Sequence, residues 1–177
     1  ASAFNMDKLL WLNQHYIKKG DPARIARLLS PHMGDLGIDP SEEPPLVDVV
    51  VAQQERARSL VEMAEISAFI YKDFDDYDEK AAKKHLRPAV LEPLEKLREA
   101  LATLDDWIPD SLHRTVTEVA ESQELKLGKV AQPLRVAVVG RAASPGIDIT
   151  LQLVGREACL RRIDRAIEYI RQRTDGI

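Results

Sequence analysis

The chain has 177 residues, of which 45% are hydrophobic and 31% charged, so it can fold around a core. Its apolar runs fall far short of the roughly 20 residues that a membrane-spanning helix needs, and its first residues lack the pattern of a secretion signal. The single cysteine, Cys159, excludes an internal disulfide and fits a reducing compartment. We therefore expect a folded cytoplasmic protein without a membrane segment.

Positive charge is concentrated at the C-terminal end, although the whole chain carries a net charge of −4. Residues 126–177 hold ten of the 25 Lys and Arg but only five of the 29 Asp and Glu. An acidic body with a basic tail suggests a polyanionic partner for the tail. A solvated basic helix without a partner would have the same composition, so composition leaves both interpretations open.

Helical patterns account for the N-terminal part of the chain. Asn5 can cap a first helix, and Asp21-Pro22 has the pattern of a second helix start. Glycines, prolines and acidic residues between positions 34 and 45 indicate a linker. Two more helices are predicted over residues 45–56 and 59–71.

The acidic run at residues 72–78 is predicted to be a solvated turn, because it lacks the glycine and the spaced glutamate of a calcium loop. The helical pattern then returns at residue 79. Leucines recur at helical spacing over residues 91–104, Pro109 begins another helix, and a last helix is predicted over residues 156–173.

Two segments between these helices are ambiguous. Residues 134–139 are rich in valine, and residues 147–153 alternate strictly between apolar and polar positions. By this pattern alone they would form a pair of strands around the turn at residues 140–146.

Catalytic patterns are scarce. The sequence has no phosphate-binding glycine loop and no serine-nucleophile motif. Its histidines show no metal-ligand spacing: His15, His32, His85 and His113. Cys159 lies on the apolar side of the last predicted helix, which indicates a buried thiol. By itself the chain does not resemble an enzyme.

Cations interleaved with apolar residues precede a rigid turn. The cations are Lys126, Lys129, Arg135 and Arg141, and the turn is Ser144-Pro145-Gly146. Proteins that recognise single-stranded RNA loops use such side chains, since a planar guanidinium can stack on a base and donate paired hydrogen bonds. A helical corner with solvated charges would share this pattern.

The same residues carry a family resemblance. The segment KLGKVAQPLR from Lys126 to Arg135, with Gly140 and the Ser144-Pro145-Gly146 turn, resembles the C-terminal signature of bacterial glutamyl-tRNA synthetases. The opening segment, residues 3–17, is similar to the stretch that follows the catalytic domain in that family. Gly155-Arg156-Glu157 also matches, in the expected order.

This resemblance implies an all-α fold with two helical anticodon-binding subdomains. It places the end of the stem-contact region at residues 1–35, the first subdomain at 36–77 and the second at 78–177. The two ambiguous segments are helical in the family, so we predict helices there, because packing can override β-propensity.

The resemblance also implies a parent enzyme that joins glutamate to tRNA(Glu), using ATP and magnesium on a separate catalytic domain. We expect this chain alone to be an inactive monomer without catalytic residues, cofactor or metal. Its implied anticodon-binding residues are Arg135, Ser144, Pro145, Gly146, Ile147 and Arg56, with Arg58 as the alternative to Arg56. We predict phosphate contacts at Lys126, Lys129 and Arg141. The competing hypothesis is a helical protein-interaction module whose basic tail has no specific RNA target.

Overall fold

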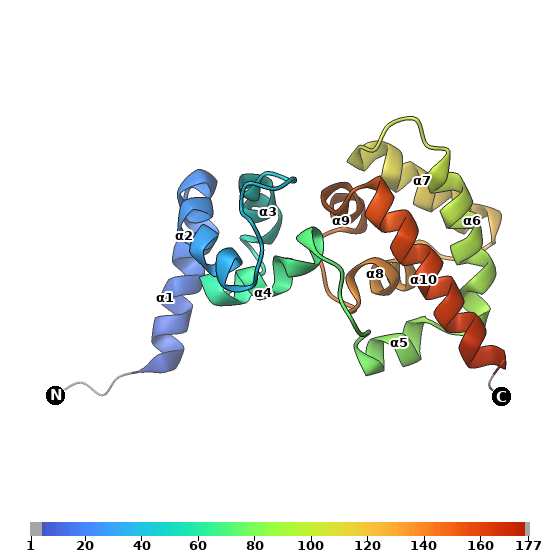
Figure 1. The fold of residues 1–177 in the computed structure, drawn as a ribbon, viewed down its shortest axis with the longest axis horizontal. Coiled ribbons are helices and arrows are strands. Elements are labelled where there is room, and N and C mark those ends of the chain that lie inside the picture. Colours follow the sequence, from blue (N-terminus) through green and yellow to red (C-terminus); the bar gives the residue numbers. More distant parts are fainter. Residues whose placement is uncertain (1–4, 176–177) are drawn as a thin grey trace. The chain divides into compact units, whose positions relative to one another are not determined.

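The computed structural model describes residues 5–175, and within them all regular secondary structure is helical (Figure 1). This confirms the predicted all-α class. The helices are α1 (Met6–Lys19), α2 (Pro22–Asp35), α3 (Leu46–Gln53), α4 (Leu60–Tyr71), α5 (Glu79–His85), the 3-10 helix η1 (Pro88–Val90), α6 (Leu91–Ala102), α7 (Pro109–Ser122), α8 (Leu127–Val139), α9 (Ile147–Val154) and α10 (Arg156–Asp175). No helix of residues 5–175 is both long and apolar enough to cross a bilayer.

The chain forms two compact units, residues 1–73 and residues 74–177. Unit 1 contains α1 to α4, and unit 2 contains the remaining helices. The three-part division at residues 35 and 77 stays a prediction, because two compact units do not by themselves place those boundaries.

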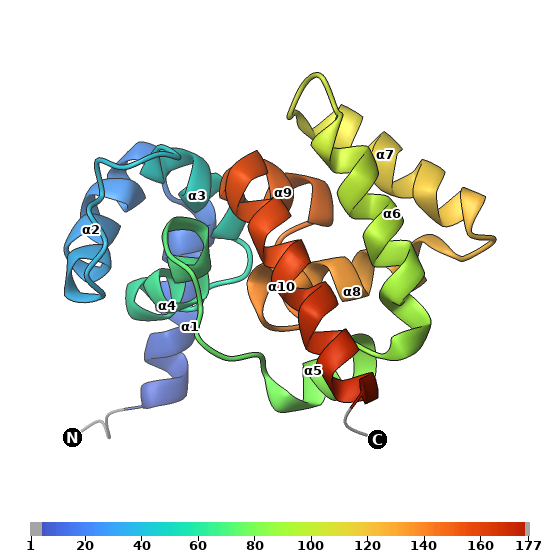
Figure 2. The ribbon, with the colours of Figure 1, turned by 45° about the vertical axis from the view of Figure 1, so that its right-hand side comes forward.

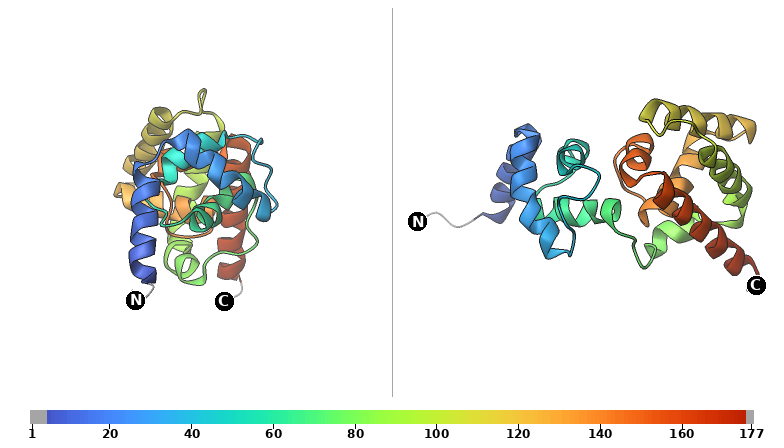
Figure 3. Two further views of the ribbon diagram at one scale, coloured as in Figure 1. Left: turned by 90° about the vertical axis from the view of Figure 1, so that its left-hand side faces the viewer. Right: turned by 45° about the horizontal axis from the view of Figure 1, so that its top comes forward.

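Unit 1 is built on α2, which packs against α3 and α4 (Figure 3). The predicted caps are confirmed: the side chains of Asn5 and Asp21 accept hydrogen bonds from the first turns of α1 and α2. Leu29, Met33 and Met63 are fully buried in its core. The segment predicted to be a linker connects α2 to α3 inside this unit.

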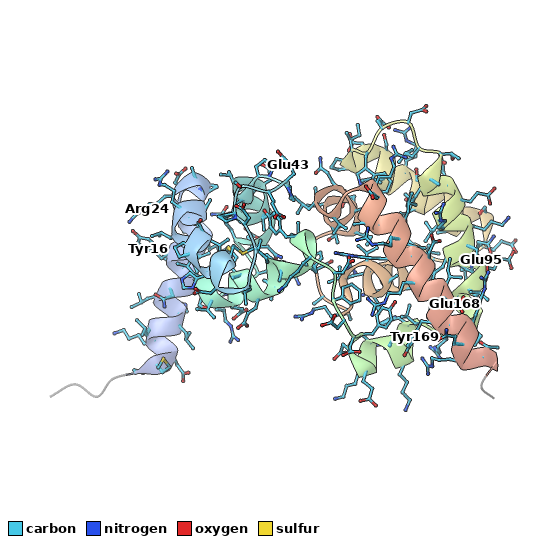
Figure 4. All side chains as sticks on the ribbon, viewed as in Figure 1. Tyr16, Arg24, Glu43, Glu95, Glu168 and Tyr169 are labelled. Carbon is cyan, nitrogen blue, oxygen red and sulfur yellow. The ribbon has the colours of Figure 1, made fainter. Side chains whose placement is uncertain are left out.

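The helix α1 is less buried than the others in unit 1. Trp11 is 62% exposed, and Ile17 is its one buried residue among those described. The guanidinium of Arg24, on α2, lies 5.4 Å from the centre of the Tyr16 ring, so this cation–π contact helps to hold α1 against α2 (Figure 4).

Unit 2 has one continuous apolar core. The last helix, α10, lies along α6 and also contacts α8 and α9, while α7 packs against α6, α8 and α9 (Figure 2). The predicted leucine stripe is confirmed, because Leu94, Leu97 and Leu101 are fully buried on α6. The apolar faces of α7 and α10 are buried as well, through Leu112, Val116, Val119, Ala120, Ile163, Ile167 and Ile170, and the partly buried Leu160 packs against the same core.

The two ambiguous segments are helices, as the resemblance implies, and the strand interpretation is wrong. Gly140 ends α8 in the left-handed conformation, with φ of +85°, which is a common helix C-terminus. In α9, Ile147, Thr150 and Leu151 are buried together, at helical spacing. The buried threonine concealed the helical face, since a polar residue stood where an apolar one was expected.

The first residues of unit 2 are held by its later helices. The backbone N–H of Asp78 donates to the Gly140 carbonyl at 2.8 Å. Arg165, on α10, donates to the carbonyls of Phe74 and Asp75 and lies over the Phe74 ring. These bonds fix the acidic segment, which is non-helical as predicted, at the end of α8.

Candidate nucleic-acid interface

Arg135 links helix α8 to the Ser-Pro-Gly turn. It is half-buried on α8, and its Nε donates to Ser144 Oγ at 2.8 Å. One of its terminal nitrogens donates to Gln132 Oε1, one helical turn earlier, at 2.7 Å. Two acceptors therefore hold the guanidinium plane in one orientation.

The turn itself is cross-linked by hydroxyl groups. Ser144 Oγ lies 2.7 Å from the Pro145 carbonyl, and Thr150 Oγ1 lies 3.0 Å from the same oxygen. Pro145 and Ile147 are buried, whereas Gly146 is exposed and Ser144 is half-exposed. Of the predicted turn contacts, Ser144 and Gly146 can thus reach a ligand, and the other two support the turn from inside.

A groove lies beside the N-terminal half of α8. It has a volume of about 710 Å³ and lies between the end of α5, η1 and the start of α8. We call it the basic groove, and its lining residues are Lys84, His85, Arg87, Ala89, Val90, Leu125, Lys126, Gly128, Lys129, Gln132 and Pro133.

The charge of the basic groove has one sign. Four lining residues are Lys or Arg, and none of its described lining residues is acidic. Burial lowers the pKa of the half-buried His85, and the positive charges of Lys84, Arg87 and Lys129 lower it further. Because these cations line one groove together with His85, they form an arrangement that attracts an anion.

The start of α8 adds to this positive potential. Lys126 is the N-cap residue, and its side chain makes no capping hydrogen bond. The N-terminus of a helix carries a partial positive charge and unpaired backbone N–H groups. The partial charge and the N–H groups are therefore at the same end of α8 as Lys126 and Lys129.

The predicted phosphate-contacting residues divide between two places. Lys126 and Lys129 are exposed and line the basic groove. Arg141 is exposed beyond the other end of α8, about 20 Å away at the helical rise per residue. The structure therefore brings the two lysines together and separates Arg141 from them.

The remaining predicted arginine lies in unit 1. Arg56 and Arg58 both follow α3 and are exposed. Arg58 Nε lies 3.4 Å from Glu62 Oε2, whereas Arg56 makes no ion pair with a described residue. This contrast favours Arg56 for a ligand contact, and its role stays a prediction.

Sequence reasoning missed the α5 wall of the basic groove. Lys84, His85 and Arg87 belong to the basic run Lys83-Lys84-His85-Leu86-Arg87, at the end of α5. The run is a detectable signal, but its place opposite Lys126 and Lys129 depends on the tertiary fold. Gln132, which borders both the groove and Arg135, was quoted in the family motif without a role.

Other chemistry finds little support in this structure. Within residues 5–175 there is no group of three His, Cys, Asp or Glu side chains that could hold a metal ion. Cys159 is fully buried, and this burial raises the pKa of its thiol to about 12. A thiol in that state is a poor nucleophile, so the predicted buried cysteine is confirmed.

Comparison with known proteins identifies the kind of domain. A family model described as an anticodon binding domain matches residues 24–167, which include parts of both units. Glutamate–tRNA ligase 1 of Alkalilimnicola ehrlichii is 54% identical over 99% of the chain, and glutamate–tRNA ligase of Legionella pneumophila strain Corby is 48% identical over 100% of the chain. The chain spans only 37% and 38% of those two relatives.

The fold has a solved counterpart. A crystal structure of a glutamate tRNA ligase from Elizabethkingia meningosepticum, in complex with its amino acid, superposes with a TM-score of 0.87 and 26% sequence identity. The match covers 96% of this chain and 34% of that one. The helical architecture is therefore that of a part of such ligases.

Proposed function

Because the chain belongs to the anticodon binding domain family, we propose that it recognises the anticodon loop of tRNA(Glu) as part of a longer glutamate–tRNA ligase. The parent enzyme would attach glutamate to the tRNA, using ATP and magnesium on a catalytic domain outside this chain. The chain alone would bind RNA without activating glutamate.

The observation that carries this proposal is the fixed guanidinium of Arg135 beside an exposed turn. RNA loops expose unstacked bases, which proteins recognise by stacking on planar groups and by hydrogen bonds to base edges. The bonds to Ser144 and Gln132 orient the Arg135 plane before any ligand arrives. A pre-oriented plane loses less entropy on binding than a mobile one.

Phosphate contacts would position the loop on this plane. Lys126 and Lys129 are exposed on the same helix as Arg135, and Arg141 follows its end. Phosphate contacts set register and orientation, whereas base contacts supply specificity. The resemblance assigns the third anticodon base to Arg56, and the exposure of this side chain is compatible with that role.

The test is a binding titration with anticodon stem-loop RNA. Arg135→Ala should weaken binding by about 1–3 kcal/mol, the cost of losing one base-recognising contact. It should also reduce the discrimination against RNAs with altered anticodon bases. The matched control is Arg98→Ala on α6. It also removes one positive charge, but from an arginine whose guanidinium is paired with the Asp164 carboxylate.

If Arg135 served only to hold the turn, Ser144→Ala would weaken RNA binding as much as Arg135→Ala does. Ser144→Ala removes an acceptor that holds the guanidinium but leaves the charge, so it should weaken binding less than Arg135→Ala. Equal affinity of the unmodified chain for every anticodon variant, or no binding at low salt, would reject anticodon recognition. That outcome would favour the helical protein-interaction module.

A further inference from the structure

We propose that the basic groove is a nucleotide-binding site for the RNA strand next to the anticodon, with a backbone phosphate on its cationic rim and a base or ribose against its apolar wall. This inference rests on the proposed function, since it assigns a second contact on the same RNA. It adds α5 and η1, to which neither the sequence motifs nor the comparisons assign a role.

Charge is the first argument. The cations of the groove come from two elements far apart in the sequence: Lys84 and Arg87 from the end of α5, and Lys126 and Lys129 from the start of α8. Four like charges around one hollow repel each other, and no described acidic residue of the lining neutralises them. Such an arrangement costs folding free energy, which an anionic ligand would recover.

Shape is the second argument. The volume of about 710 Å³ lies within the range of small-ligand sites and exceeds what a phosphate alone needs. Val90, Leu125 and Pro133 give the groove an apolar wall. An apolar wall beside a cationic rim can accept a single strand, because a base or ribose can pack against the wall while the rim attracts the backbone phosphate.

Local geometry keeps the α5 wall in place. Asp78 caps α5 by accepting from the Ala81 N–H at 3.0 Å. Arg87 Nε donates to the Lys84 carbonyl at 3.0 Å, which fixes the arginine stem at the end of the helix. The rim is thus partly organised before an anion binds.

Continuity with the Arg135 site is the third argument. Gln132 lines the groove, and its side-chain oxygen accepts from Arg135 at 2.7 Å. A strand whose base contacts Arg135 therefore has the groove beside it along α8, in the direction of Lys126. One strand could therefore contact both sites through their shared neighbour Gln132.

The decisive measurement is the salt dependence of stem-loop binding. Each phosphate contact to a single strand contributes about 0.7 to the slope of log affinity against log salt. The double substitution Lys84→Gln and Arg87→Gln should flatten this slope by about 0.7, because the proposed site holds one phosphate. The matched control is Lys80→Gln with Lys83→Gln, which removes two charges from exposed residues of the same helix that do not line the groove.

Equal slopes for the two double variants would overturn the groove site. The positive charge of α5 would then act on the RNA as a whole, and not through a contact in the groove. Discrimination among anticodon bases should persist in the Lys84/Arg87 variant, since Arg135 is intact. A loss of base discrimination in Arg135→Ala together with equal slopes would refute the groove and leave the proposed function standing. Binding without any base discrimination would refute the proposed function.

A second variant tests the shape argument without changing charge. Gly128 lines the groove, and a Cβ built there meets no atom within 4 Å. Gly128→Leu should therefore fold normally while filling the groove. It should weaken RNA binding about 5- to 150-fold, as expected for losing one base contact. Unchanged affinity with an unchanged circular dichroism spectrum would overturn the site.

A free anion must be distinguished from an RNA strand. A site for free phosphate alone would let inorganic phosphate, compared with chloride at equal ionic strength, raise the melting temperature of the unmodified chain but not of the Lys84/Arg87 variant. It would also leave the salt slope of stem-loop binding equal in that variant and in its control, and these two results together would overturn the strand assignment.

Discussion

Gly140→Ala should destabilise unit 2 by about 2–5 kcal/mol. Gly140 has φ of +85°, and the left-handed conformation costs a residue with a Cβ about 1–2 kcal/mol. The new Cβ would stand 2.8 Å from Phe74 Cδ2, whereas ordinary contacts begin at 3.4 Å. The ring would have to move by about 0.6 Å, although Arg162 and Arg165 both lie over it. Overpacking of this kind adds about 1–3 kcal/mol.

The matched control is Gly128→Ala, at the other end of α8. A Cβ at Gly128 meets nothing within 4 Å, so alanine should be neutral or stabilise the helix by about 0.5–1 kcal/mol. The free energy of unfolding of both variants can be measured in urea by the fluorescence of Trp107. This residue reports on unit 2, because its indole N–H donates to the Leu151 carbonyl. A Trp11→Phe background removes the signal of unit 1. Unfolding free energies within about 0.5 kcal/mol of each other would refute the reasoning.

Three further predictions concern titratable groups. Cys159 should not react with a thiol reagent at pH 8 until the chain is unfolded, because burial raises its pKa to about 12; rapid reaction in the folded state would contradict its burial. Burial, with added repulsion from nearby acidic residues, raises the pKa of Tyr71 to about 12, so its phenol should ionise late in an absorbance titration, and Tyr71→Phe should reduce the late component, to which Tyr77 also contributes because burial raises its pKa. RNA binding should strengthen as the pH falls below about 7, because a bound phosphate favours the protonated form of His85, whose pKa in the free groove is lowered by burial and by the nearby cations. The difference between the unmodified chain and His85→Gln isolates this effect, and identical pH profiles would exclude it.

The sequence predicted most helices because their caps and apolar faces are local features. Asn5 and Asp21 cap α1 and α2 through bonds to residues three positions later, which a reader of the sequence can anticipate. The segments of α8 and α9 were ambiguous for a physical reason. In α8 the run from Val136 to Val139 is buried on all sides, so it carries no helical periodicity. In α9 the buried position that defines the helical face is Thr150.

The candidate site was only half predictable. Lys126 and Lys129 stand out because they share one motif with Arg135. Lys84 and Arg87 lie some forty residues earlier, and α5 comes beside α8 only through the packing of unit 2. The hydrogen bond from Arg135 to Ser144 likewise depends on the angle between α8 and the turn. Residue types can be recognised in a sequence, but partners across a fold cannot.

The bonds from Arg165 to the carbonyls of Phe74 and Asp75 have a consequence for synthesis on the ribosome. The two bonds span 91 and 90 positions of the sequence. The first residues of unit 2 can therefore be fixed only after α10 has emerged. Unit 1 closes over shorter separations, such as the bond from Gln54 to the Ile17 carbonyl, 37 positions apart. We therefore expect unit 1 to fold on the growing chain, while unit 2 stays open until α10 has been made. A nascent chain stalled within α10 would expose the Phe74 ring and the core of unit 2 to proteases.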